Sequence, residues 1–154
     1  MISVTLARSL ATAGVRWRPA SGDSFVIDGA EFGGEVFTLS DMTIEAHEFD
    51  TGTILGFNGT TEWALDSVAL ESALWMPRED QLRDLLGGTF RALSREGELF
   101  HVEIALGDAT AVFIAPDAAD AYAFAVLELV GRAVGEPAVR SGTGVPGCRR
   151  AARR

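Results

Sequence analysis

The sequence contains no lysine, because all 13 basic residues among its 154 are arginine. This absence excludes a phosphate-loop lysine, a Schiff base and lysine-linked pyridoxal phosphate, since each needs a lysine amine. Cysteine occurs once, at Cys148, so an internal disulfide and a zinc site built from several cysteines are excluded as well. We therefore expect no cofactor, and the sequence indicates no catalytic residue.

Long apolar runs are also missing. No stretch approaches the roughly 20 apolar residues that a membrane-spanning helix needs. The first segment, MISVTLARSLATAGVRW, carries polar residues throughout, whereas a signal peptide needs a continuous apolar core. These features predict a cytoplasmic protein that does not insert into a membrane.

Charge is distributed unevenly along the chain. All 22 acidic residues precede Ala138, whereas the segment after Val139 contains five arginines and no carboxylate. An acidic body repels nucleic-acid phosphates, which argues against direct nucleic-acid binding by that body. The composition after residue 136 shifts to Gly, Pro, Arg and Ala, which is typical of a disordered segment. We expect one domain over residues 1–136 and a disordered Arg/Gly/Pro tail over 137–154.

The longest helical pattern covers residues 117–134. Pro116 and the N-cap Asp117 precede it, Asp120 lies in its first turn, and Gly135 follows its end. Its apolar residues do not form a single stripe. Phe124 falls almost opposite the helix face that carries Ala119, Tyr122, Val126, Leu129 and Ala133. We predict a core helix that packs on two sides.

The second half of the chain, about 76–136, has an αβββα pattern. A helix begins after Pro77 and ends at Gly87-Gly88, and strands follow near 89–95, 98–106 and 110–115. Two short turns, Glu96-Gly97 and Gly107-Asp108, join these strands as antiparallel neighbours. The final helix is expected to close this unit over the sheet.

The first half, about 1–66, predicts an antiparallel β-meander preceded by a helix over 2–13. A strand follows the turn at 21–23, and three apolar runs cover 35–40, 43–49 and 53–57. The loops between these runs are so short that we expect antiparallel neighbours. The fold class expected for the whole chain is therefore α+β, with the helices packed on the sheets.

The segment after these runs has two interpretations. Asn58-Gly59 is a strong type I′ turn signal and predicts a return strand near 60–65. The sequence TTEWALDSVALESALW, however, also has apolar residues at helical spacing. We expect a strand that gives way to a helical turn after Asp66, with a continuous helix as the alternative.

The two histidines give the only candidate metal site. Glu45 and His47 are two residues apart and therefore lie on the same face of one predicted strand. His101 and Glu103 lie on one face of another predicted strand in the same way. If the sheets bring the pairs together, two imidazoles and two carboxylates could bind a divalent metal and activate a water. The competing interpretation is that both pairs lie on solvated faces, where Arg91 and Arg95 provide a cross-strand charge partner for Glu103.

Two tryptophans, Trp63 and Trp75, lie on either side of the junction between the predicted halves. Tryptophan is enriched where protein partners bind, because its ring supplies a large contact area and its indole N–H supplies a donor. We therefore take these two residues as candidates for partner binding, with an exposed edge strand as the other candidate surface.

Five stretches of the sequence carry a resemblance to known proteins, namely VRWRPASGDSFVI, EVFTLSDM, GFNGTTEWALDS, LWMPREDQLRDLLGGTF and APDAADAYAFAVLEL. They resemble one family of short bacterial proteins that are labelled pilus-assembly CpaE-like. The resemblance implies an accessory role in pilus assembly. It brings no catalytic residues with it, because this chain has neither a phosphate loop nor a lysine.

Our interpretation of the sequence is a non-catalytic protein-binding or adaptor module with an unidentified protein partner. One alternative is a small metal-dependent hydrolase that uses the pairs at His47 and His101. Another is an acidic nucleic-acid mimic that occupies a nucleic-acid-binding protein, because such a protein would be attracted to the acidic body.

Overall fold

The structure is a computed structural model that describes residues 1–27, 34–40, 44–57 and 67–135. Within these residues the chain forms three α-helices and three small antiparallel sheets, which confirms the predicted α+β class. The chain divides into two compact units, with unit 2 (Arg16–Met76) inserted into unit 1 (Met1–Val15 and Pro77–Arg154). No described helix is both long and apolar enough to cross a membrane.

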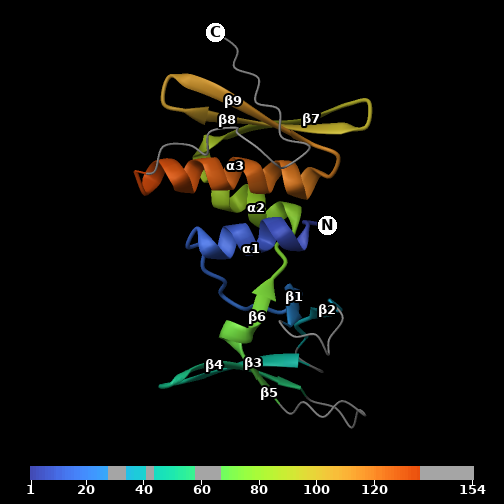
Figure 1. Ribbon diagram of the computed structural model, residues 1–154, viewed down its shortest axis with the longest axis vertical. Coiled ribbons are helices and arrows are strands. Elements are labelled where there is room, and N and C mark those ends of the chain that lie inside the picture. Colours follow the sequence, from blue (N-terminus) through green and yellow to red (C-terminus); the bar gives the residue numbers. More distant parts are fainter. Residues whose placement is uncertain (28–33, 41–43, 58–66, 136–154) are drawn as a thin grey trace. The chain divides into compact units, whose positions relative to one another are not determined.

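Unit 1 contains the final helix and the αβββα pattern that the sequence predicted. In chain order it consists of α1 (Val4–Thr12), α2 (Glu79–Leu86), the 3-10 helix η3 (Gly87–Thr89), β7 (Phe90–Glu96), β8 (Leu99–Leu106), β9 (Ala109–Ala115) and α3 (Ala118–Ala133). Helix α3 lies across one face of the β7–β8–β9 sheet and contacts α1 and α2 on its other side (Figure 1). The prediction of a core helix packed on two sides is confirmed.

The start of α3 follows the predicted capping chemistry. The Asp117 carboxylate accepts a hydrogen bond from the Ala119 N–H at 2.9 Å, which satisfies one of the free amides of the first turn. Asp120 accepts a hydrogen bond from the Ser3 N–H at 2.8 Å and so ties the segment before α1 to α3. The halves expected from the sequence missed this link, because they placed the first helix with residues up to 66.

Small side chains allow α3 to lie close to its neighbours. Five alanines of this helix are buried, namely Ala118, Ala119, Ala121, Ala123 and Ala125. Larger residues fill the space between them, and the Tyr122 ring lies 5.7 Å from the Phe90 ring of β7. Burial of its phenol raises the pKa of Tyr122, because the charged form would lose its hydration.

Unit 2 contains two three-stranded antiparallel sheets around one core. Its elements are β1 (Ser24–Ile27), β2 (Val36–Thr38), β3 (Ile44–Phe49), β4 (Gly52–Phe57), β5 (Ser67–Ala69), the 3-10 helix η2 (Leu70–Ser72) and β6 (Ala73–Trp75). The sheet orders are β2-β1-β6 and β3-β4-β5. One buried cluster joins them, since Phe25 and Ile27 of the first sheet pack with Ile44, Leu55 and Val68 of the second.

The expected pairing of antiparallel neighbours is confirmed for β3 with β4 and is wrong for the step from β2 to β3. The short connection between these two strands was expected to join neighbours, but β2 pairs with β1 and β3 pairs with β4. A single pair, Ser40 with Ile44, closes the turn between the two sheets. The physical reason is that Leu39 and Ile44 both enter the common core, so the chain crosses from one sheet to the other.

The segment 67–75 forms a strand, a 3-10 turn and a second strand, so the helical alternative is wrong for these residues. The helical turn that was expected directly after Asp66 begins only at Leu70, because Ser67–Ala69 form strand β5 and the 3-10 turn η2 follows it. The predicted turn at Asn58-Gly59 and the strand near 60–65 lie outside the described residues, as does the predicted tail at 137–154.

Candidate functional site

The two histidine–glutamate pairs belong to different units. Glu45 and His47 lie on β3 in unit 2, and His101 and Glu103 lie on β8 in unit 1. The His47 Nε2 atom is 3.8 Å from Glu45 Oε2, whereas His101 Nε2 is 4.0 Å from Oε2 of Glu96 rather than of Glu103. Among the residues that the structure describes, no three His, Cys, Asp or Glu side chains are grouped to hold a metal ion.

The expected cross-strand partner of Glu103 is wrong. In the β7–β8 register Ala92 lies opposite Glu103, and Arg95 lies opposite Phe100. The Arg95 guanidinium sits 5.2 Å from the Phe100 ring centroid, and the Arg91 guanidinium donates to the Gly88 carbonyl. The position of the turn accounts for the difference, because the register runs without a shift from the Glu96–Leu99 pair to Ala92 and Glu103, and the register shift lies beyond it, between Phe90 and Ala92.

The structure describes only one of the two candidate tryptophans, Trp75. Trp63 lies outside the described residues. Trp75 is half-buried in β6, opposite Phe25 of β1, and its Nε1 is buried without a hydrogen-bond partner in the described part of the chain. Partner binding by these two residues stays a prediction.

An open depression of about 310 Å³ lies in unit 2. Its walls are the turn at 19–21, the pair Leu39 and Ser40, and the first four residues of β3, which include Glu45 and His47. This volume is at the small end of the range of ligand pockets, enough for one or two side chains of a partner. The depression therefore brings the first predicted pair together with two serines, Ser21 and Ser40, that the sequence did not single out.

The turn that forms one wall is fixed by a buried carboxylate. Asp23 is 2% exposed, and its Oδ2 accepts hydrogen bonds from Trp17 Nε1 at 2.9 Å and from the Ala20 N–H at 3.0 Å. Gly22 has a φ of +88°, which favours glycine at this point of the turn. The stretch WRPASGD thus encodes a closed loop that is held from within, and its aspartate was the available sequence signal.

The imidazole on the other wall lies against a glycine. A Cβ atom at Gly56 of β4 would be 3.0 Å from Cδ2 and 3.1 Å from Nε2 of His47. Gly56 pairs with Glu45 in the register, two positions along from the Ile54 partner of His47. Because Gly56 has no side chain, the His47 ring can lie directly over the backbone of β4 at this position.

Strand β3 is an edge strand whose outer backbone groups are available beside this depression. Ile44 and Ser40 exchange two hydrogen bonds, of 2.9 and 3.0 Å, on the side away from β4. Because backbone groups alternate between the two sides of a strand, those of Ala46 and Glu48 face the same outer side. No hydrogen bond of the described residues reaches these outer groups. Among the described residues, Ser40 thus occupies the first position alongside β3, and the next two positions are open.

The side chains along this edge are exposed and mostly polar. Ala46, His47, Glu48 and Phe49 are all exposed, and Phe49 at the end of the strand is 58% exposed. Alternation places Phe49 on the same strand face as Glu45 and His47. An aromatic ring, two carboxylates and free backbone groups together form a surface suited to an extended peptide. We call residues 44–49, with this outer side, the β3 edge.

Comparison with known proteins gives no further identification, since no protein-family model, no curated protein and no solved structure matches the chain. The similarity to CpaE-like proteins therefore stays an expectation from the sequence.

Proposed function

We propose that the protein is a non-catalytic protein-binding module that pairs an extended segment of a partner protein with the β3 edge. The observation that carries this proposal is the outward-facing backbone of Ala46 and Glu48, which follows the Ser40–Ile44 pair and has no hydrogen-bond partner in the parts of the chain that the structure describes. A strand added here would continue the β3-β4-β5 sheet by one strand. In this mode main-chain hydrogen bonds supply affinity, and neighbouring side-chain pockets supply specificity.

The surroundings of the β3 edge support the same mode. The depression beside residues 44–47 can receive a side chain of the partner segment, and its wall is held in place by Asp23. Exposed Phe49 offers an aromatic anchor at the other end of the strand. A site that is rigid before binding loses less conformational entropy when the partner is ordered on it.

A second edge strand, β7 of unit 1, is less suited to this role. It is exposed along most of its length, but a register shift interrupts its pairing, and two arginines, Arg91 and Arg95, lie on it. Charged residues lie on both edges, so irregular pairing, which protects an edge against added strands, is the feature that separates them. The β3–β4 register runs without a shift from Ile44 to Phe49. We therefore assign partner binding to unit 2.

A cytoplasmic location and a partner in pilus assembly, both expected from the sequence, belong to the same proposal. A catalytic metal site has no support among the described residues, so the hydrolase alternative is not pursued. The acidic-mimic alternative shares one feature with our proposal, namely a protein partner held on an acidic surface.

The experiment uses three seven-residue peptides in which valine alternates with arginine, threonine or glutamate. Binding to the full chain is measured by fluorescence anisotropy. We expect at least one peptide to bind, and we expect Ala46→Pro to weaken that binding about tenfold or more, because proline lacks the outward N–H. Proline is tolerated at edge positions whose N–H faces solvent, so the β3–β4 pairing should persist.

Leu93→Pro on β7 is the matched control. The two-residue turn at 97–98 makes Glu96 and Leu99 a doubly bonded pair, so alternation places the Leu93 N–H outward. This variant should bind the peptides like the unmodified chain. A peptide methylated on alternate backbone nitrogens tests the pairing without changing the protein. Binding that survives both Ala46→Pro and N-methylation, or no binding by any peptide, would contradict the proposal.

A further inference from the structure

The net charge of the chain belongs entirely to unit 2. Residues 16–76 contain half of the 22 acidic residues but only two arginines, Arg16 and Arg18, so their formal charge equals the −9 of the whole chain. The remaining residues, 1–15 and 77–154, carry equal numbers of acidic and basic groups. The charge separation follows the boundary between the two units, which the linear sequence did not make evident.

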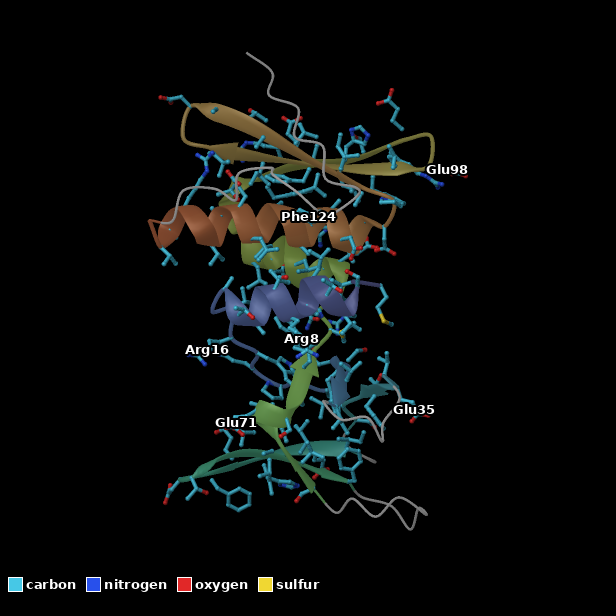
Figure 2. All side chains as sticks on the ribbon, viewed as in Figure 1. Arg8, Arg16, Glu35, Glu71, Glu98 and Phe124 are labelled. Atoms are coloured by element: carbon cyan, nitrogen blue, oxygen red, sulfur yellow. The ribbon has the colours of Figure 1, made fainter. Side chains whose placement is uncertain are left out.

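Several of these carboxylates lie on or near the β3 edge. Glu45 and Glu48 are on β3 itself, and Asp50 is in the turn that follows it. Glu71 on η2 reaches the start of β4, where its Oε1 is 3.7 Å from the Cβ position of Gly52. Glu35 and Glu71 extend outward from unit 2 (Figure 2). Within the described residues none of the four carboxylates at 45, 48, 50 and 71 is paired with an arginine.

The uncompensated negative charge of unit 2 affects which partner can bind at the β3 edge. Like charges repel within a compact unit, and a basic partner would relieve this repulsion. The same acidic residues disfavour a second copy of β3, because like charges would then face each other across the strands. They also disfavour nucleic acid. Specificity at an edge is often obtained in this way, by rejecting the wrong partners as well as attracting the right one.

We infer that the segment bound at the β3 edge is an extended basic segment of a partner protein, with arginine or lysine at alternate positions. This inference rests on the proposed function and adds the chemistry of the partner to it. The segment pairs with the backbone of Ala46 and Glu48. Because alternate residues of an extended segment share one face, its basic side chains lie together on the face of Glu48 and contact that carboxylate, and the residues between them lie on the face of His47 and Phe49. Arginine fits best, because its guanidinium can bind a carboxylate through two parallel hydrogen bonds.

The three peptides described above test this inference on the full chain. We expect the arginine peptide to bind about tenfold or more tightly than the threonine peptide and the glutamate peptide to show no binding. The affinity of the arginine peptide should fall steeply as the salt concentration rises, because exposed charge pairs are screened. Equal affinities for the arginine and threonine peptides, lost together in Ala46→Pro, would overturn the inference and leave the proposed function intact.

Two variants that each remove one carboxylate show where on unit 2 the arginine peptide is recognised. Glu48→Gln should weaken the arginine peptide severalfold and leave the threonine peptide unchanged. Glu35→Gln removes the same charge from an exposed residue of the same unit that precedes β2, and it should have little effect. Equal losses in the two variants would mean diffuse attraction to the unit, which overturns recognition at the edge.

The same peptide and variants also test two other possible occupants of the β3 edge, namely the chain's own arginines after residue 136 and a second copy of the chain. If the arginine peptide binds only after residues 137–154 are removed, the chain's own arginines occupy the edge, and a partner segment is excluded. If the chain is a dimer that Ala46→Pro dissociates in sedimentation, a second copy occupies the edge. Either result would overturn the inference, whereas unchanged peptide binding without the tail and a monomeric chain would support it.

Discussion

At the scale of single residues, the buried carboxylate of Asp23 decides the shape of the candidate site. It accepts hydrogen bonds from Trp17 and Ala20 and so closes the loop that forms one wall of the depression. Trp75 provides the contrast, because its indole N–H is buried without a partner in the described part of the chain. A buried donor or acceptor that loses its partner costs about 1–3 kcal/mol, so the two tryptophans should respond differently to the same substitution.

We predict that Trp17→Phe destabilises unit 2 by about 1.5–3 kcal/mol more than Trp75→Phe. Both substitutions remove similar ring area from half-buried residues, but only the first leaves the Asp23 carboxylate short of a donor. Amide hydrogen exchange of β1 and β6 measures this difference, because it reports local stability within unit 2. Equal losses in the two variants would show that the Trp17–Asp23 bond does not stabilise the loop.

At the scale of elements, α3 shows how close packing depends on small residues. Its buried alanines face the sheet on one side and α1 and α2 on the other, so added volume has no free space to enter. Gly131 near the end of the same helix is different, because nothing lies within 4 Å of the position that a Cβ would occupy.

We predict that Ala123→Leu destabilises unit 1 by about 1–3 kcal/mol through overpacking. Gly131→Ala should instead stabilise it by about 0.5–1 kcal/mol, since alanine loses less conformational entropy in a helix. Hydrogen exchange of α3 and β8 compares both variants with the unmodified chain. The packing account would be contradicted if Ala123→Leu were neutral.

The elements that the sequence predicted well are those fixed by local signals. Helix α3 and strands β7 to β9 follow from capping residues, strict alternation and two-residue turns, all within a few positions of each residue. The separation of β2 and β3 into different sheets could not be predicted in this way, because it depends on the packing of Leu39 and Ile44 with residues of both sheets in one common core. The same holds for the candidate site. Glu45 and His47 were found by spacing, but the free backbone beside them follows only from strand order.

At the scale of the whole molecule, unit 2 is an insertion between α1 and α2 of unit 1. Helices α1, α2 and α3 and the β7–β8–β9 sheet contact one another within unit 1. The elements of unit 2 likewise share their own core cluster. Each unit therefore has the buried apolar contacts that an independently stable domain requires.

We predict that unit 1 folds without unit 2. A chain in which residues 16–76 are replaced by a flexible linker of about eight glycine and serine residues should retain the helical circular dichroism of α1, α2 and α3. It should unfold in a single cooperative transition, as small single domains do. Loss of protection in α3 and β8 would contradict the division into units. The same chain should not bind the valine-alternating peptides, because it lacks the β3 edge.

The account as a whole depends on an added strand at β3, and backbone hydrogen exchange measures this directly. With a bound peptide, the amides of Ala46 and Glu48 should become protected. Those of Glu45 and His47, which already face β4, should change little. Protection that appears on β7, or nowhere along residues 44–49, would contradict the account.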